Sequence, residues 1–193
     1  MYLILITNIL ILITKECNNE IKAMTCSASS EYNDDWLCKN AIDGKSDTDW
    51  ATRGKGTGSW IQLNFGAFYK VETIRIKHRS SGGSPLSEMF KGISLEFSDG
   101  KKASFTLNNV PFTNGLVWND IVFPHDPMSD YVKITATSVY GTINNGFSDI
   151  RVFGCRDGIK IYIERHLLFF LKLIDILLPT FIVFLIFGRM RQR

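Results

Sequence analysis

Residues 58–66 read GSWIQLNFG, and this stretch predicts the fold of the chain. Its apolar residues Ile61, Leu63 and Phe65 alternate with polar ones, and a glycine stands at each end. Successive side chains of a β-strand point to opposite faces, so a period of two places these three residues on one buried face. We therefore predict a strand with one face toward a core and the other toward solvent.

The same alternation recurs along the middle of the chain. It is seen in VETIRIK (71–77), GISLEFSDG (92–100), SFTLNN (104–109), LVWNDIVF (116–123), YVKITAT (131–137) and FSDIRVFG (147–154). Turn-forming residues separate these segments at 98–100, 124–127 and 140–146. No helical period appears between residues 24 and 158. Seven or eight short strands predict an all-β fold, either a β-sandwich or a small barrel.

The N-terminal segment is apolar and is predicted to be a signal peptide. Residues 2–13 form an apolar run that is too short to span a bilayer but has the length of a signal-peptide core. Polar residues follow from Lys15 onward. We assign residues 1–16 to the signal peptide, with cleavage expected somewhere between about residues 14 and 23.

The C-terminal segment is predicted to cross a membrane as a helix over residues 167–188. The 21 residues from Leu167 to Phe187 would span about 31 Å as a helix, which matches the hydrocarbon layer. Three arginines follow in the tail 189–193, which the positive-inside rule places in the cytoplasm. We expect a single-pass type I protein of the plasma membrane, with an extracellular domain joined by a linker, residues 156–166.

Two charged residues interrupt the predicted membrane helix. Lys172 and Asp175 lie three residues apart and hence on one helix face. They could pair with each other, or Asp175 could contact a polar group of another membrane helix. The second reading predicts a transmembrane partner, and both readings stay open.

The charge of the chain argues against a nucleic-acid partner. The whole chain carries a net charge of +3, but residues 24–158 contain 14 basic and 15 acidic residues. The excess of basic residues therefore comes from the two ends of the chain. A domain without a basic bias has no electrostatic basis for binding nucleic acid.

Several motifs in a fixed order resemble those of a known family. CSASSEY, NAIDG, DWAT, GSWIQLNFG, VETIRIKHR, GISLEFSDG, YVKITA and GFSDIRVFGC follow one another from residue 26 to residue 155. This order resembles the coagulation-factor type C, or discoidin, domain of the galactose-binding-like superfamily, in particular its divergent invertebrate branch. The resemblance covers residues 24–155 and implies a jelly-roll β-sandwich.

The four cysteines fit an oxidising compartment, and four cysteines allow three disulfide connectivities. Zinc is disfavoured because no C-x-x-C occurs and the three histidines are scattered. In the resembled domain a cysteine ahead of the first strand is bonded to one at the end of the last. This implies Cys17–Cys155 together with Cys26–Cys38. A Cys26–Cys155 bond is the alternative if signal cleavage removes Cys17.

The acidic stretch NAIDGKSDTDWAT, residues 40–52, raises the question of a catalytic or metal site. Catalysis is not expected, because no raised-pKa acid and no nucleophile–base pair is suggested. Many relatives wrap a calcium ion at this loop, since hard cations take carboxylate, hydroxyl and carbonyl oxygens. The resemblance implies that a structural Ca²⁺ would be held by the side chains of Asp43, Thr48 and Asp149 and by the carbonyls of Asn40 and Lys45. The alternative is an ion-free turn in which Asp43 accepts backbone N–H bonds.

Ligand binding is expected at loops on one end of the sandwich, as in the resembled jelly rolls. Sugar binding needs an aromatic face for stacking and polar or charged groups for the hydroxyls. Six residues of the candidate loops offer such groups: Trp36, Arg53, Lys55, His78, Arg79 and Tyr140. Each could instead be an ordinary core or surface residue.

Two functions follow from these observations. The first is a membrane-tethered, non-catalytic recognition module that binds an extracellular glycan or protein, as in adhesion. The second is a structural or receptor-complex subunit whose membrane helix recruits a partner through Lys172 and Asp175. Glycan binding by the extracellular domain would separate the two.

Overall fold

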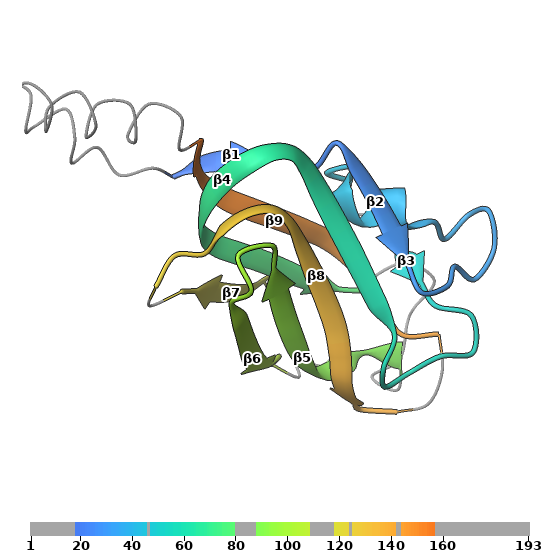
Figure 1. Ribbon diagram of the computed structural model, residues 1–193. Coiled ribbons are helices and arrows are strands. Elements are labelled where there is room, and N and C mark those ends of the chain that lie inside the picture. Colours follow the sequence, from blue (N-terminus) through green and yellow to red (C-terminus); the bar gives the residue numbers. More distant parts are fainter. Residues whose placement is uncertain are drawn as a thin grey trace, which may run out of the picture. The chain divides into compact units, whose positions relative to one another are not determined.

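The computed structural model describes residues 18–45, 47–79, 88–108, 118–123, 125–141 and 144–156 (Figure 1). These residues confirm the all-β prediction, because they form nine strands and one short 3₁₀ helix. They belong to one compact unit, Lys15–Arg156. The predicted signal peptide and membrane helix lie outside the described residues. Within the described ranges, no helix is long and apolar enough to cross a membrane.

The elements follow one another in the order shown in Figure 1. They are β1 (Asn19–Ile21), β2 (Thr25–Ala28), η1 (Cys38–Ile42), β3 (Trp50–Ala51), β4 (Trp60–His78), β5 (Phe90–Phe97), β6 (Lys102–Thr106), β7 (Trp118–Val122), β8 (Met128–Val139) and β9 (Gly146–Arg156). The sheet therefore begins before residue 24, because β1 pairs with β9 and buries Ile21.

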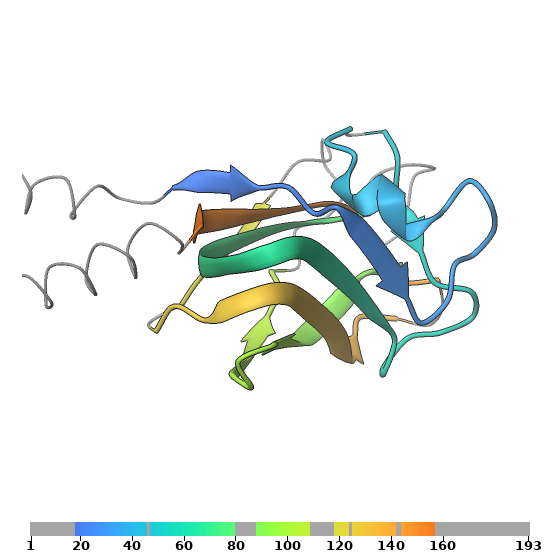
Figure 2. The same cartoon turned by 45° about the horizontal axis from the view of Figure 1, so that its top comes forward.

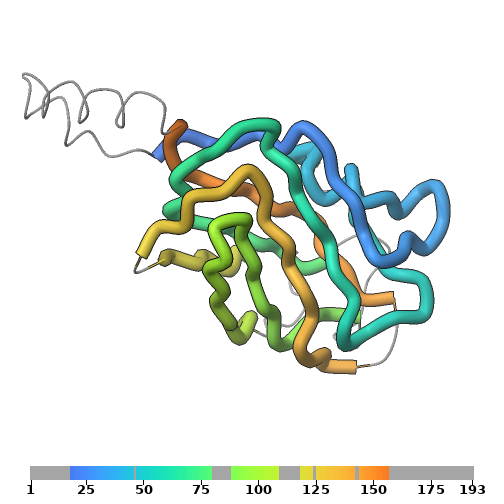
Figure 3. The backbone as a smooth tube through the Cα atoms, viewed as in Figure 1, coloured from blue at the N-terminus to red at the C-terminus, as the bar shows by residue number. Residues whose placement is uncertain are grey.

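The strands form two layers that share β4. In the first layer β2, the first part of β4, β8, β5 and β6 are neighbours in that order, all antiparallel. In the second layer β9 lies between β1 and the second part of β4, which in turn pairs with β7. The short β3 also pairs with the start of β9. The tube trace in Figure 3 shows β4 passing from one layer to the other.

β4 is one continuous strand of 19 residues where the sequence predicted two separate strands, so that prediction was wrong. The chain bends at Gly66, whose φ of 73° is a conformation that other residues rarely adopt. Met24 packs against this bend, and its Sδ would lie 2.1 Å from a Cβ at position 66. Glycine thus lets the backbone turn without interrupting the strand. The sequence contains no turn motif that would predict this bend.

The apolar alternation of β4 changes phase between its two parts. Ile61, Leu63 and Phe65 are buried at odd positions, whereas Ile74 and Ile76 are buried at even ones. The pairing with β9 has a register irregularity between Val71 and Thr73, which supplies the shift of one residue. Because one residue of slip moves side chains to the opposite face, this irregularity keeps both parts facing the same core.

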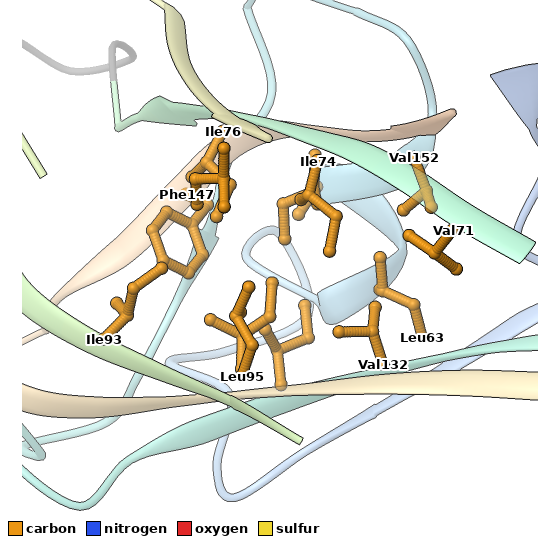
Figure 4. Packing of buried hydrophobic residues seen from close by; sticks show 14 of the residues in the cluster. Leu63, Val71, Ile74, Ile76, Ile93, Leu95, Val132, Phe147 and Val152 are labelled. Carbon is orange, nitrogen blue, oxygen red and sulfur yellow. The ribbon is translucent and has the colours of Figure 1, made fainter. Parts of the chain in front are cut away.

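The core lies between the two layers (Figure 4). Its aliphatic part joins Leu63 and Val132 of the first layer to Ile74 and Val152 of the second. Its largest side chains form an aromatic group in which Trp50 lies 6.1 Å from Phe90 and 5.9 Å from Phe147, between ring centroids. Trp50 is fully buried and its Nε1 donates to the Ser30 carbonyl at 3.1 Å. The sandwich therefore encloses a core whose indole also holds Ser30, in the loop after β2, in place.

The two ends of the sandwich differ in their connections (Figure 2). At one end lies the bend of β4 at Gly66, next to the start of β1 and the end of β9; we call it the bend end. At the other end lie the β2–η1 and β3–β4 connections and the end of β4; we call it the loop end.

Candidate functional site

Arg79 is the centre of the polar contacts at the loop end. It follows the last residue of β4, and its side chain is only 7% exposed. Its Nη1 donates to Glu88 Oε2 at 2.7 Å and to the Asn144 carbonyl at 2.6 Å. Its Nε lies 3.5 Å from Asp49 Oδ2. One buried guanidinium thus joins chain segments that are distant in sequence.

Trp36 completes this group, because the Arg79 guanidinium carbon lies 4.5 Å from the centre of its ring. Two hydrogen bonds also fix the Trp36 backbone: its N–H donates to the Asn33 carbonyl, and its carbonyl accepts from the Ala51 N–H. A cation stacked on an indole is attracted by the ring's electron density and fixes the ring's orientation. We call Trp36, Asp49, Arg79, Glu88 and Asn144 the Arg79 cluster.

Asn144 connects the Arg79 cluster to the β3–β4 loop. Its φ of 66° is left-handed, which asparagine tolerates better than most residues. Its Oδ1 accepts a hydrogen bond from the Gly54 N–H at 2.9 Å. Arg53 and Lys55, on either side of Gly54, are both exposed. Two basic side chains therefore project from a loop whose backbone is fixed to the cluster.

His78 and Tyr140 belong to a different group. His78 is 8% exposed, its Nε2 lies 3.2 Å from the Asn108 carbonyl, and burial lowers its pKa. Tyr140 Oη donates to the neighbouring Leu107 carbonyl at 3.0 Å. The structure thus brings Trp36, Arg53, Lys55 and Arg79 to one region, whereas the other two predicted ligand residues contact residues 107–108.

The predicted ligand residues did not include Asp49, Glu88, Asn144 or Tyr32. Tyr32 lies on the same loop as Trp36 and is 43% exposed, which makes it a second aromatic group at the loop end. The Asn-Asn-Gly sequence at 144–146 could have predicted a left-handed backbone conformation there. Nothing in the sequence links Glu88 to Arg79.

In the predicted calcium loop, the Asp43 carboxylate accepts hydrogen bonds from residues of the same loop. Its Oδ1 accepts the Lys45 N–H at 2.8 Å, and Thr48 Oγ1 donates to Oδ2 at 2.9 Å. The Asn40 side-chain amide donates to the carbonyls of Asp35 and Asp49. These contacts are those of the ion-free turn, although the same carboxylate and hydroxyl oxygens are also suitable calcium ligands.

Asp149 fits the calcium set less well. It lies in β9, is 3% exposed, and its Oδ2 accepts from Arg151 Nη2 at 2.9 Å. Burial raises the pKa of its carboxyl, while Arg151 and Lys77 act in the opposite direction. Because the Asp149 carboxylate already neutralises the Arg151 guanidinium, it is a poor fifth calcium ligand beside Asn40, Asp43, Lys45 and Thr48. In the described part of the chain, no three His, Cys, Asp or Glu side chains are placed to hold a metal ion. Calcium binding stays a prediction.

The disulfide Cys26–Cys38 is present and joins β2 to η1, with the two Cα atoms 6.0 Å apart. This confirms one predicted bond and excludes the alternative Cys26–Cys155. The other predicted bond involves Cys17, which lies outside the described residues. The observed bond lies two residues beyond Trp36 and restrains the loop that carries it.

Solved structures with this fold include several carbohydrate-binding modules. The family 32 CBM of Clostridium perfringens NanJ, in complex with galactose, has a TM-score of 0.57 and 23% identity, covering 70% of this chain and 98% of that one. Chitosan-binding module 1 of a Paenibacillus sp. IK-5 chitosanase/glucanase has a TM-score of 0.52 and 19% identity, covering 71% and 98%. At these identities the likeness establishes the fold alone.

A third structure is CBM32-5 of the Clostridium perfringens protein CpGH89, in complex with GalNAc-β-1,3-galactose. It has a TM-score of 0.56 and 20% identity, covering 70% of this chain and all of that one. No curated protein matches the chain significantly. The F5/8 type C domain model matches residues 25–151. Because this match spans more than half of the 193 residues, the chain belongs to the F5/8 type C domain family, as the order of its motifs predicted.

Proposed function

We propose that the protein is a non-catalytic recognition module that binds a glycan at the loop end and is tethered to the plasma membrane with its domain outside the cell. The observation that carries the proposal is the Arg79 cluster. It holds Trp36 in a fixed orientation beside a loop with two exposed basic side chains. The fold shared with carbohydrate-binding modules supports the same reading.

Each part of this region has a function in sugar recognition. An indole offers a flat apolar surface for the C–H face of a sugar ring, because that face carries few hydroxyls. Arg53 and Lys55 supply hydrogen-bond donors for hydroxyl or carboxylate groups. Arg79, being buried and paired, acts as a positioning residue for Trp36. Preorganised groups bind more tightly, since less conformational entropy is lost on association.

The contacts of three acidic residues, Asp43, Asp49 and Asp149, support a non-catalytic function. Asp43 accepts hydrogen bonds from its own turn, Asp49 pairs with Arg79, and Asp149 pairs with Arg151. Glycoside hydrolysis by carboxylates needs one acid that is protonated at working pH and a second across the bound sugar. These three carboxyl groups are instead engaged in contacts that stabilise the fold, and Asp149, whose pKa is raised by burial, is held in an ion pair by Arg151.

Membrane tethering rests on the sequence of residues 167–193. An apolar segment long enough to cross a bilayer is followed by three arginines. The pair Lys172 and Asp175 is the group that we propose for a transmembrane contact with a partner.

A glycan array probed with the full chain in phosphatidylcholine nanodiscs would identify ligands, and calorimetry would measure their affinity. We expect Trp36→Ala and Arg53→Ala each to weaken binding by at least about tenfold, which corresponds to about 1.4 kcal/mol. Lys102→Ala is the matched control, because Lys102 is exposed on β6 and outside the Arg79 cluster. Absence of binding at millimolar sugar would overturn the proposal and favour the receptor-subunit alternative.

A further inference from the structure

Two large apolar side chains are exposed close to Gly66 at the bend end. Met24 is 74% exposed and Phe68 is 58% exposed. Both belong to one small region, because Met24 packs against Gly66 and its N–H donates to the Asn64 carbonyl at 2.8 Å. We call Met24 and Phe68 the apolar tip. The rings of Phe65 and Tyr69, on either side of the bend, contact each other. Phe68 is not part of this contact and is exposed to solvent.

The described chain enters and leaves at this same end. Asn19 of β1 is paired with Gly154 of β9, and Arg156, the last residue of β9, is paired with Tyr69. Only residues 157–166 separate Arg156 from the apolar segment that begins at Leu167. Ten residues reach at most about 35 Å when fully extended. The chain therefore leaves the described domain at Arg156, beside the apolar tip, and continues toward its predicted membrane segment.

The chemistry of the bend end suits a lipid surface. An aromatic ring and a thioether are side chains that partition into the boundary between headgroups and acyl chains. Arg156 is exposed beside the tip and can reach lipid phosphates, and Lys22, whose side chain is 76% exposed, lies next to the tip in an ion pair with Glu20.

The size of the tip also favours a lipid surface over a protein partner. A stable protein interface buries about 800 Å² on each side, more than two side chains supply. A tether changes this requirement, because it gives the tip a high effective concentration at the bilayer, so a weak contact suffices.

We propose that the apolar tip inserts into the outer surface of the bilayer and holds the domain upright on it. This inference goes beyond glycan binding and rests on the proposed membrane tether. β4 runs nine residues from Tyr69 at the tip to His78 at the loop end, which is about 30 Å at about 3.3 Å per residue. The tip contact therefore turns the Arg79 cluster away from the membrane, toward ligands on a facing surface or in the surrounding matrix.

Hydroxyl-radical footprinting of the full chain in phosphatidylcholine nanodiscs tests this orientation. The same chain, released by a protease site inserted between Gly158 and Ile159, is the reference. We expect oxidation of Met24 and Phe68 to rise at least about fivefold on release, because lipid no longer covers them. Tyr32 at the loop end is the internal control and should change little. Equal oxidation of the tip in both states would overturn the proposal, as would a full chain that fails to float with phosphatidylcholine vesicles.

A double variant separates insertion of the tip from simple nearness to the bilayer. Met24→Ser with Phe68→Ser removes the apolar groups at exposed positions, so the fold is kept. Acylation of Lys22 by a water-soluble reagent should be slow in the parent chain on nanodiscs and several-fold faster in the double variant. Lys102, on β6, should react equally in both. Unchanged protection of Lys22 would show that the tether alone shields it and would overturn insertion. Neither readout involves a glycan, so failure here is distinct from failure of glycan binding.

Discussion

The loop end and the bend end are the two ends of the same strands, yet they are held in different ways. At the bend end the chain turns within β4 itself, and antiparallel pairing resumes at Tyr69 after a register shift between Asn64 and Tyr69. At the loop end the chain is held by side chains: one disulfide, one buried arginine and one left-handed asparagine. Backbone pairing is insensitive to most side-chain changes, whereas contacts through single side chains are lost by single substitutions.

Under the proposed function, this difference couples stability to recognition at the loop end. The side chains that fix the loop end also position Trp36, so a substitution there should affect both folding and binding. At the bend end, exposed side chains can change without disturbing the sheet. The following predictions test that contrast.

The largest effect is expected from Arg79. Arg79→Met leaves Asp49 and Glu88 without their guanidinium, and breaking a buried ion pair from one side costs about 3–5 kcal/mol. Arg75, on β4 just before Arg79, is the matched control, because it also lies over a tryptophan, Trp118, and pairs with Asp120. Its side chain is 37% exposed, so Arg75→Met should cost no more than about 1 kcal/mol. Urea denaturation measures both, and equal losses would contradict the contrast.

The disulfide at the loop end should come next. Replacing both Cys26 and Cys38 by serine removes a cross-link across 12 positions of sequence. The chain-entropy model gives a loss of about 3 kcal/mol for a loop of this size. Thermal unfolding would measure the loss, and glycan affinity should fall as well because the cross-link restrains the Trp36 loop. If the double serine variant unfolds at the same temperature as the parent chain, the Trp36 loop is fixed by contacts other than the disulfide.

Calcium, if it binds, should act on the loop end alone. An ion that binds only the folded chain adds about 2.7 kcal/mol to stability at 100 times its dissociation constant. We expect EDTA to lower the unfolding temperature and Asp43→Asn to remove the effect of added calcium. Identical unfolding curves with EDTA and with calcium would instead support the ion-free turn formed by Asp43, Lys45 and Thr48.

The smallest effect is expected from acidification at His78. Burial lowers the pKa of His78 in the folded chain below its ordinary value of about 6.5. The unfolded chain therefore binds more protons as the pH falls through that range, and stability decreases. His78→Gln should reduce the difference in unfolding temperature between pH 7.5 and pH 5.5. His125→Gln is the control, because His125 is exposed. An unchanged difference in the His78 variant would contradict this account.

Periodicity predicted much of the fold, because a strand with one buried face leaves a pattern of two in the sequence. The odd positions 61, 63 and 65 and the even positions 74 and 76 are buried as predicted. The continuity of β4 could not be predicted, because the glycine that bends it also looks like the end of a strand. The pairing of β1 with β9 was missed since three residues are too few to show a period.

The candidate site was predicted less completely. His78 and Arg79 were proposed together as ligand residues, but adjacent residues of an extended chain point to opposite sides. Arg79 accordingly meets Trp36 and Glu88, whereas His78 meets Asn108. This separation follows from strand geometry and was available from the sequence. The contacts of Arg79 with Glu88 and Asn144 were not, because they depend on how distant loops come together.

The register of β9 has a mechanical consequence. β9 starts at the loop end with Gly146 and finishes at the bend end with Arg156, and it is paired with β4 from Phe147 to Arg156. A pull between a ligand at the loop end and the chain beyond Arg156 would act along the axis of this strand. The hydrogen bonds between antiparallel strands are perpendicular to that axis and would share the load in shear. Such a pull has to break them together, so the domain should resist tension far better than it would if β9 were peeled away pair by pair.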